Sequence, residues 1–519
     1  MAVDAPPSKT FTRDEVAQRG KSDDALWFII DTFVYDATDF VDAHPGGEAV
    51  LRQVAGTDAT TAFYNLHRHE VLARYADMAI GTIAGEKPSI ITPQPGDLSP
   101  VPYAEPLWLT PPFKSPYYGE SHRRLRRFVR EFVDTHVTPE ALEAERTGQH
   151  ISQGLIERMG AAGLLHLRMG PGRHLDGAAE LAGGAVKPRE VDYFHDLVNT
   201  QEFVRATARG FQDGNLAGMT IGLSPVLNFC RNDALRARVT EEVFAGRKKI
   251  CLAITEAFAG SDVAGLRTTA EKTPDGRFYV VNGTKKWITN GTFSDYFSTA
   301  VRTGKGLSML LIERGEGVET KPIKTSYSAA AGTAYVTFDN VKVPVENLIG
   351  EENKGAYVVF SNFNHERWVM AAASVRLSRV VVEECLKWSH QRLVFGKRLI
   401  DQPVIRQKLA KMIALVEANQ AWLESVTYQM CEMPYAQQAR HLAGPISLLK
   451  MSCTRAAHEI ADEAVQIWGG RGLTQTGMGR VIENFNRTYK FDAILGGAEE
   501  VLGDLGVRQA MKNMPKAML

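Results

Sequence analysis

The segment CLAITEAFAGSDVAGLRTTAE, Cys251 to Glu271, decides how the rest of the chain is interpreted. Small residues alternate in it with hydroxyls and glycines, so main chain and side-chain hydroxyls can approach a flat polar ring. The segment NGTKKWITNG, Asn282 to Gly291, follows it. In a strand, Trp287 and Thr289 point to the same face, so one can stack while the other hydrogen-bonds. Either segment alone fits plain β structure, so the interpretation depends on what surrounds them.

The hydrophobic period of the surrounding chain changes twice. Helical patterns dominate from about Tyr117 to Arg238, with one Gly-, Ala- and Pro-rich break at Arg168 to Glu190 that we expect to be a loop. From Ile250 to about Pro344 the period becomes two, with turns expected at Asn-Gly and Asp-Gly. From Asn353 helices return. The order is therefore helices, sheet, helices.

A smaller unit precedes them, from about Lys9 to Gly85, and contains the motif His-Pro-Gly-Gly at His44 and a second histidine, His67, 23 residues later. A Pro-Gly-Gly turn presents the first imidazole from a rigid loop, and the second can face it across a flat cofactor. Two imidazoles on one iron leave no open coordination position. Such a haem moves single electrons and does not bind oxygen.

This unit resembles a cytochrome b5 domain. The similarity includes VYDATDFVDAHPGG (Val34 to Gly47), AGTDAT, the FYNLH box and the closing IGTI. The resemblance implies a small α+β fold with haem b held by His44 and His67. His69 is a rival second ligand, but the pattern Phe-x-x-Leu-His fits Phe63 to His67.

The large unit resembles the acyl-CoA dehydrogenase family over roughly Ser115 to Arg508. The two opening segments carry this resemblance together with Phe338 to Gly355, Gln391 to Met412 and Gln466 to Leu473. The family fold is an N-terminal helical domain, a middle β-barrel and a C-terminal four-helix bundle. FAD lies between barrel and bundle and also contacts a neighbouring subunit, so the resemblance implies a homodimer or homotetramer.

We therefore expect a multidomain protein. Its predicted domains are a cytochrome b5-like domain (1–87), a proline-rich linker (88–115), a helical domain (116–249), a β domain (250–352) and a helical bundle (353–519). The segment from Gly85 to Pro116 holds nine prolines and keeps no hydrophobic period, which predicts an extended linker lying on a surface.

Site residues follow from the family motifs. The expected contacts of the flavin ring and of the substrate's head are Thr255, Ser261, Trp287 and Thr289. The expected contacts of the adenosine and pyrophosphate end are Arg392, Phe395, Gln402, Gln466 and Gly470. The second group would reach FAD across a subunit interface. Ser261 and Arg367 are the predicted substrate contacts.

The Tyr-Glu-Gly-Thr turn that supplies the general base in most family members is absent from this chain. In AILGGAEEVLG, Leu495 replaces the Tyr, Gly496 the Glu and Ala498 the Thr. In the isovaleryl and long-chain types the base lies on an earlier helix, one residue before an Arg. Glu366 followed by Arg367 matches that position.

Glu366 also lies on an apolar helix face, where an unpaired carboxylate is costly unless it is used. The resemblance makes it the base, while Gly496 clears space and offers an N–H to the thioester carbonyl. The alternatives are a buried Glu paired with Arg367, or a base at Glu499 or Glu500.

The predicted function is FAD-dependent α,β-dehydrogenation of an acyl-CoA, with electrons passed through the haem to an external acceptor. The alternative is a flavin monooxygenase or oxidase on the same fold. In this hypothesis a reductase reduces the haem, and the haem reduces the flavin. A non-enzymatic electron-transfer or scaffold protein is a third hypothesis, in which Glu366→Gln changes nothing.

Composition sets the outer limits. The formal net charge is zero, which argues against nucleic acid as the main partner. The five cysteines have no CxxC spacing, which favours reduced thiols inside a cell. No run approaches 18 apolar residues, so we expect no transmembrane segment. The N-terminus does not read as a secretory signal or a mitochondrial presequence, and the C-terminus is not a recognised peroxisomal ending. We therefore expect a cytoplasmic protein, with peroxisome and mitochondrion as the alternatives.

Overall fold

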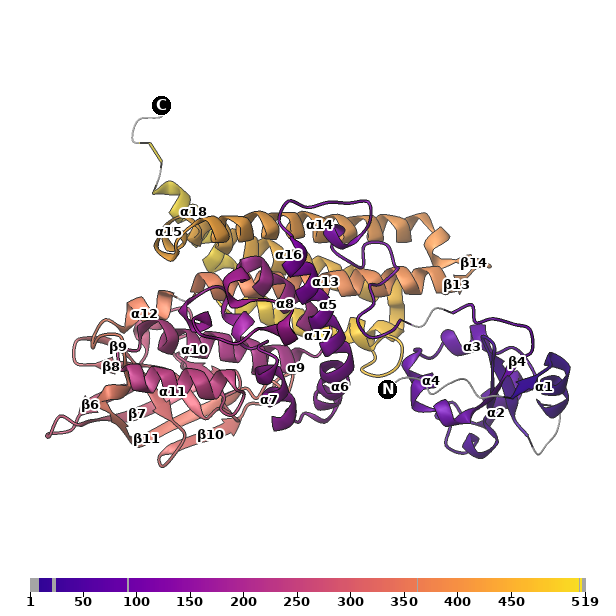
Figure 1. Cartoon of the computed structure of the whole chain (residues 1–519), viewed down its shortest axis with the longest axis horizontal. Helices are drawn as coiled ribbons and strands as arrows, with labels where there is room; N and C mark the ends of the chain where they lie inside the picture. The colour runs from indigo at the N-terminus through magenta and orange to yellow at the C-terminus, as the bar shows by residue number, and fades with distance from the viewer. Residues whose placement is uncertain (1–8, 21–24, 91–92, 362, 513, 516–519) are drawn as a thin grey trace.

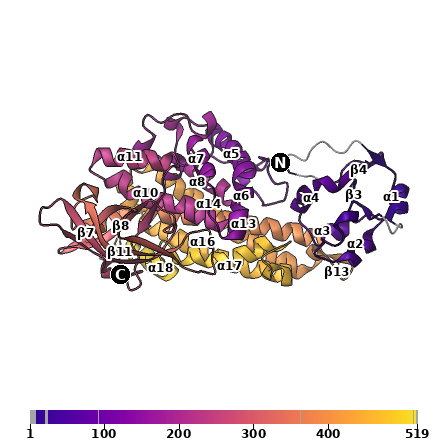
Figure 2. The ribbon, with the colours of Figure 1, turned by 90° about the horizontal axis from the view of Figure 1, so that it is seen from below.

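The computed structural model describes residues 9–20, 25–90, 93–361, 363–512 and 514–515 of the 519-residue chain. The molecule is elongated. Its N-terminal unit lies at one end of the long axis and its β domain at the other, with the helical bundle running between them (Figures 1 and 2). This arrangement separates the two regions in which cofactors are predicted.

The N-terminal unit is a four-stranded sheet in the order β1-β4-β3-β2, packed against short helices. Its two hydrophobic clusters contain only residues of this unit, so it has a core of its own. Its elements are β1 (Thr10–Phe11), α1 (Arg13–Gly20), β2 (Trp27–Ile30), β3 (Phe33–Asp36), α2 (Glu48–Val54), α3 (Thr60–Tyr64), α4 (Glu70–Arg74) and β4 (Ala79–Ile83).

The helical domain packs its apolar faces against both the sheet and the bundle, in one large core. The expected loop from Arg168 to Glu190 contains short 3₁₀ turns and an isolated bridge between Leu181 and Val186, and Leu175 and Leu181 within it are buried. Its helices are α5 (Glu120–Phe132), α6 (Thr138–Thr147), α7 (Gln153–Ala161), α8 (Tyr193–Val204), α9 (Arg209–Phe211), α10 (Gly218–Phe229) and α11 (Asp233–Phe244).

The β domain is one sheet in which β10-β11-β7-β6-β8-β9-β12 are neighbours and β5 pairs with β8. Alternate side chains of these strands build its core. Its strands are β5 (Ile250–Ala253), β6 (Thr269–Lys272), β7 (Phe278–Ile288), β8 (Tyr296–Thr303), β9 (Gly306–Glu313), β10 (Val318–Pro322), β11 (Ala334–Pro344) and β12 (Leu348–Ile349).

The turn predictions in this domain need one correction. Asp275-Gly276 and Asn290-Gly291 do form turns, but Asn282 and Gly283 lie inside β7. A Cβ added to Gly283 would lie 2.7 Å from the Cα of Thr268, so glycine serves a close approach between strands there. Opposite it, β11 has a bulge at which the Asn340 N–H donates to Asn282.

The C-terminal bundle is built on three helices of 26 to 30 residues, α13, α14 and α16. Their facing apolar side chains form its core. Its elements are α12 (Gly355–Ser361), α13 (Phe363–Gln391), β13 (Leu393–Val394), β14 (Lys397–Arg398), α14 (Pro403–Glu432), α15 (Tyr435–His441), α16 (Ala443–Trp468), α17 (Arg480–Ile494) and α18 (Glu499–Met511).

The proline-rich segment differs from the surface linker that its composition predicts. Glu105 is buried and accepts from Arg130 of α5 at 2.5 Å and from Arg376 of α13 at 3.2 Å. Arg130 also binds Glu202 of α8 at 2.7 Å. Trp108 is buried a few residues later. Because buried charges require partners, this ionic cluster fixes the segment inside the helical domain.

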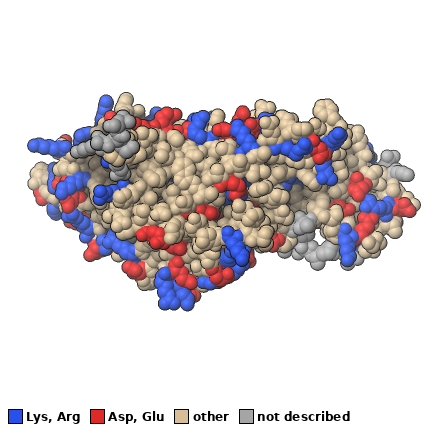
Figure 3. All heavy atoms as spheres, turned by 90° about the horizontal axis from the view of Figure 1, so that it is seen from above, with Lys and Arg blue, Asp and Glu red and all other residues tan. Residues whose placement is uncertain are grey.

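Charged side chains are distributed without a dominant sign. Lys and Arg alternate with Asp and Glu over the face shown in Figure 3. Among the described residues, no helix is long and apolar enough to cross a membrane.

Candidate functional site

A cavity of about 270 Å³ opens in the N-terminal unit and is lined mainly by apolar side chains. Its lining includes the imidazoles of His44 and His67, whose ring centroids are 6.1 Å apart. Metal–imidazole bonds of about 2 Å on each side of one ion, together with the ring radii, give roughly this spacing. The cavity therefore fits a flat apolar group with a central metal.

Backbone carbonyls orient both imidazoles. Nδ1 of His44 lies 3.3 Å from the Gly47 carbonyl, and Nδ1 of His67 lies 3.2 Å from the Phe63 carbonyl. These contacts leave each Nε2 available for a metal. Burial lowers the pKa of His67, which favours the neutral imidazole that a metal ligand must be. A Cβ on Gly46 would lie 2.7 Å from the His44 ring, which explains the glycine there.

His69, the rival ligand, is placed differently. Its Nδ1 lies 2.8 Å from the Tyr64 hydroxyl, and its ring stacks on Tyr64. It is not among the residues that line the cavity. The geometry thus favours His67 as the partner of His44.

The residues predicted to contact the flavin ring lie on the β domain. Thr255 and Trp287 are neighbours, because the Lys286 N–H donates to the Thr255 carbonyl. Trp287 is 52% exposed, so its ring face is open to a flat ligand beside that hydroxyl-bearing residue. Thr289 is half-buried and Ser261 is exposed.

The pairing of Trp287 and Thr289 on one strand face was a wrong prediction. β7 ends at Ile288, so Thr289 lies in the following turn. Trp287 has φ of +67°, a left-handed backbone that interrupts strand alternation. Such strain in an exposed aromatic residue motivates a functional hypothesis.

The residues predicted to contact the adenosine and pyrophosphate end of FAD lie at the opposite end of the bundle. Trp388 and Trp468 stack with centroids 4.6 Å apart, and Arg392 and Arg471 both lie over Trp388. The stack thereby brings the β13–β14 hairpin next to the glycine-rich turn at Gly470. Phe395 is 96% exposed at the hairpin, Gln466 is exposed on α16, and Gln402 precedes α14. Arg471 was missed by sequence reasoning.

Glu366 is the predicted base, and the structure buries it near the start of α13. The residue is 4% exposed, and Oε2 has no hydrogen-bond partner among the described residues. Burial raises the pKa of its carboxyl, although the charges of Arg367, Lys450 and His365 oppose the rise. A carboxyl with these properties is suited to accept a proton.

A glycine turn borders this carboxyl. A Cβ on Gly496 would lie 3.3 Å from Glu366 Oε1, and the turn is fixed from two sides. Arg367 Nε donates to the Gly496 carbonyl at 3.1 Å, and Lys450 Nζ donates to the Gly497 carbonyl at 2.8 Å. Lys450 was missed by sequence reasoning, because its role depends on the packing of α16 against the turn.

The alternatives for Glu366 are less well placed. Arg367 binds a carbonyl, and no ion pair between it and Glu366 is found within the part of the chain that the structure describes. Glu499 is buried but pairs with Arg455 at 3.3 Å, and Glu500 is exposed.

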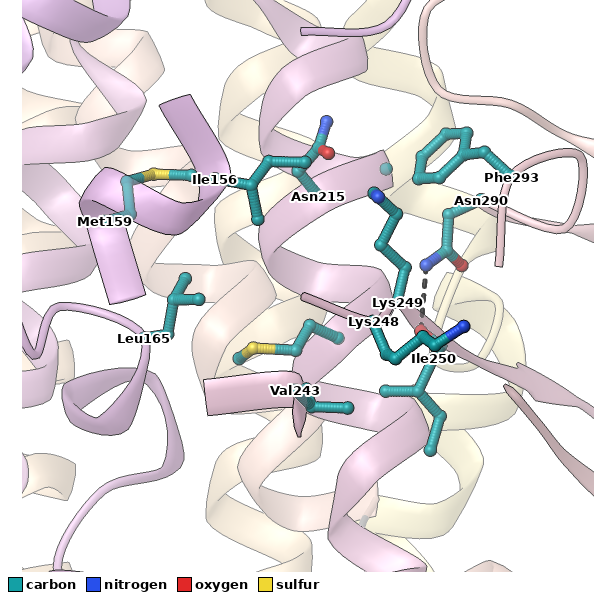
Figure 4. Close-up of a pocket in the computed structure, with 12 residues that line it drawn as sticks. Ile156, Met159, Leu165, Asn215, Val243, Lys248, Lys249, Ile250, Asn290 and Phe293 are labelled. Atoms are coloured by element: carbon teal, nitrogen blue, oxygen red, sulfur yellow. Dashed lines mark hydrogen bonds between the residues drawn. The ribbon is translucent and has the colours of Figure 1, made fainter. Parts of the chain in front are cut away.

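A small cavity of about 20 Å³ lies elsewhere, between α7, α10 and the start of the β domain (Figure 4). Asn290 donates across its edge to the Ile250 carbonyl at 2.9 Å. It has room for about one water molecule and contains none of the predicted site residues, so it is not the active site.

Comparison with known proteins matches this architecture. Acyl-CoA dehydrogenase family models match as an N-terminal domain (119–247), a middle domain (251–341) and a C-terminal domain (353–511). A cytochrome b5-like Heme/Steroid binding domain matches residues 12–84.

Individual relatives agree. The acyl-CoA dehydrogenase apdG of Emericella nidulans is 38% identical over 427 residues, covering 80% of this chain and 96% of the relative. A probable acyl-CoA dehydrogenase structure from Mycobacterium abscessus superposes with TM-score 0.68 at 28% identity, covering 76% of this chain and all of that one. An FAD complex from Bacillus anthracis has TM-score 0.68 at 25% identity, covering 78% and 69%.

The fold and the comparisons define an FAD-dependent oxidoreductase with a haem-binding unit. The chain belongs to the acyl-CoA dehydrogenase family, which acts on CH–CH groups, and carries a cytochrome b5-like domain fused at its N-terminus. The predicted fold class, enzyme class and cofactors FAD and haem are thereby confirmed.

Proposed function

We propose that this protein α,β-dehydrogenates an acyl-CoA thioester, with Glu366 as the general base. The supporting observation is the buried Glu366 carboxyl, whose Oε2 has no hydrogen-bond partner in the described part of the chain and which faces the glycine turn at Gly496. The carboxylate removes the proton from the α carbon of the substrate, while the hydride leaves the β carbon. FAD, when bound, supplies the hydride acceptor.

The protein positions these groups from separate elements. Trp287 and Thr255 place the flavin ring on the β domain, and Glu366 enters from α13. Arg367 and Lys450 hold the 496–497 turn, whose Gly496 N–H is proposed to polarise the thioester carbonyl. Ser261 is the proposed contact of the substrate's head.

The two flavin-binding groups cannot serve one FAD within a single chain. Trp287 lies on β7 of the β domain, whereas the β13–β14 hairpin, which carries Phe395, lies at the other end of the bundle (Figures 1 and 2). We therefore propose that FAD is shared between two copies of the chain in a homodimer or homotetramer. His44 and His67 would hold the haem, which, when bound, would supply a one-electron carrier between the reduced flavin and an external acceptor.

The test is anaerobic. Purified protein is mixed with straight, branched and aromatic acyl-CoAs while the oxidised flavin band and the haem Soret band are followed. We expect flavin bleaching followed by haem reduction, and loss of both in Glu366→Gln. Glu500→Gln, an exposed carboxylate, is the matched control and should react normally.

Absence of flavin bleaching with every acyl-CoA of the panel would contradict dehydrogenation. The docked position of the N-terminal unit on the bundle is compatible with electron flow in either direction. The second candidate is therefore an oxygenase or oxidase in which a reductase loads the haem. It predicts oxygen consumption with a haem reductase present.

A further inference from the structure

The N-terminal unit is docked on the bundle through the residue next to the predicted haem ligand His67. Arg68 Nη1 donates to Glu384 of α13 at 2.6 Å and to the Met478 carbonyl at 3.2 Å. Burial alone would lower the pKa of Arg68, but the charges of Glu384 and Glu70 raise it. This buried, charge-assisted contact is a specific anchor.

Further polar contacts surround the anchor. Arg480 Nη2 of α17 lies 2.9 Å from Glu70 Oε2, and the Gln391 amide donates to the Tyr64 carbonyl. None of the hydrophobic clusters crosses this boundary among the described residues. A docking face held by polar contacts resembles a transient interface. Salt screens the more exposed Arg480–Glu70 pair, and it screens the buried Arg68–Glu384 pair much less.

The haem cavity shares a wall with this docking face. Leu66, His67 and Val71 line the cavity, while Arg68 and Glu70, between them in sequence, contact the bundle. A haem held by His67 would therefore lie beside the anchor residue Arg68, close to the end of the bundle.

The flavin ring of the same chain is much farther away. Glu366 and Glu384 lie on the continuous helix α13, and their eighteen-residue separation corresponds to roughly 27 Å. The β domain that bears Trp287 lies at the end opposite the N-terminal unit (Figures 1 and 2). Electron tunnelling falls steeply with distance, so the docked haem is poorly placed for its own flavin.

The covalent connection restricts movement toward that flavin. Ser89 is bound to Asp31 of the N-terminal unit, and the Gly96 N–H donates to Asp134 of the helical domain. Seven residue steps join Ser89 to Gly96, which is a reach of roughly 25 Å at most.

The residues that are proposed to contact the FAD of a second copy gather at this same end of the bundle. Gln391, which contacts Tyr64, immediately precedes Arg392. Phe395 is 96% exposed with φ of +49°, and Leu393 is 53% exposed. An exposed apolar hairpin with a strained residue, next to a docked redox unit, is a suitable contact surface for another chain.

We propose that the docked haem exchanges electrons with the FAD of a second copy of the chain, not with the flavin of its own chain. This inference rests on the proposed function. Each oxidised acyl group yields two electrons, and ferric iron accepts one at a time and becomes ferrous. The haem therefore has to be reduced twice for each acyl group, and an external one-electron acceptor reoxidises it after each reduction. The protons of the reduced flavin leave to solvent.

Mixed oligomers test the route. Two differently tagged chains are co-expressed, and oligomers that carry both tags are purified. One chain bears Glu366→Gln with its haem ligands intact. The other bears His44→Ala and His67→Ala with Glu366 intact. An acyl-CoA that bleaches the wild-type flavin should reduce the haem of the mixed oligomer at a rate independent of protein concentration.

The other outcomes are separable. Haem reduction in the wild type but not in the mixed oligomer would overturn the cross-copy route and leave the proposed function standing. A wild-type haem that stays oxidised while flavin bleaches would refute haem transfer in the proposed function, and the inference with it.

A second experiment needs no catalysis by a haem-free chain. Glu70→Cys and Arg480→Cys, in a Cys431→Ser background, are joined by a short bismaleimide that traps the docked position. Glu48→Cys with Arg52→Cys, a pair inside the N-terminal unit, is the matched control. The crosslinked chain should migrate as a monomer under denaturing conditions.

Trapping should leave substrate-driven haem reduction unchanged. Loss of haem reduction in the trapped protein but not in the control would show that the unit must leave the dock, which overturns the proposal. A crosslink yield near zero at low salt would do the same.

Discussion

Glu366 Oε1 lies 3.3 Å from the position that a Cβ on Gly496 would occupy, so the two residues share one small space. Gly496 has φ of +65°, a conformation that costs roughly 1–2 kcal/mol for other residues. We expect Gly496→Ala to lower the free energy of unfolding by about 1 kcal/mol and to slow flavin reduction by displacing the carboxyl.

Stopped-flow bleaching and thermal melting measure these two effects. Gly315→Ala is the matched control, because its Cβ would meet nothing within 4 Å. A Gly496→Ala protein that reduces flavin at the wild-type rate would mean that Glu366 has more room than the structure shows.

Glu366→Gln should separate activity from stability. Loss of a general base slows the reaction by about 10²–10⁴-fold. The pKa of Glu366 is raised in the folded state, so its stabilising contribution is complete below the unfolded pKa and is lost as pH rises through the folded value. Glutamine never ionises, so the variant should melt at a higher temperature than wild type at neutral pH but not at pH 4.

Melting curves at both pH values check this expectation. Equal melting temperatures at neutral pH would indicate that the carboxylate has partners that offset its burial.

Lys450→Met should shift the pH dependence of flavin reduction. Burial lowers the pKa of Lys450 to about 8, with Asp492, Glu366 and Glu499 opposing. Below that pH its positive charge lowers the pKa of Glu366, as those of Arg367 and His365 do. Removing it raises the Glu366 pKa further, so the acid limb of the rate profile should move to higher pH.

The shift is measured as the reduction rate across pH at saturating substrate. Lys450→Arg, which keeps the charge, should leave the limb near its original pH. A purely structural role for Lys450 would lower the rate equally at every pH.

His67→Ala should abolish the haem Soret band, while His69→Ala should keep it. The first substitution removes an imidazole that faces His44 across the cavity, whereas the second removes one bound to Tyr64. Absorption spectra after haem reconstitution provide the measurement. A normal spectrum in His67→Ala would reassign the second ligand.

Glu105→Gln should destabilise the flavoprotein portion. It removes one charge from a buried cluster and leaves Arg376 without its carboxylate partner. Breaking such a buried pair costs about 3–5 kcal/mol. Denaturant unfolding measures the loss, and Glu143→Gln, an exposed carboxylate, is the control.

Motifs with fixed local geometry were predictable from sequence. His44 and His67 were identified from spacing and family pattern, and the structure places both rings in one cavity. Glu366 was singled out because a carboxylate interrupts an apolar helix face, and the structure buries it. In both cases the signal lies within one segment of the chain.

Features that depend on contacts between distant segments were not predictable. Arg68 meets Glu384 across 316 residues, and nothing in either local sequence announces the pair. Composition predicted a surface linker around Glu105, because prolines are visible in sequence while the partner arginines are not. Asn282-Gly283 has the sequence of a hairpin turn but serves a close approach within a long strand.

The buried position of Glu105 and Trp108 bears on how the two units can be exchanged. The compositional boundary and the structural boundary do not coincide. Recombination that separated the chain at residue 115 would carry away part of the flavoprotein's own interior. A break between residues 90 and 93 would spare it. The transferable haem unit thus ends before residue 93. A graft of it onto another dehydrogenase would have to leave the rest of the proline-rich segment with the flavoprotein.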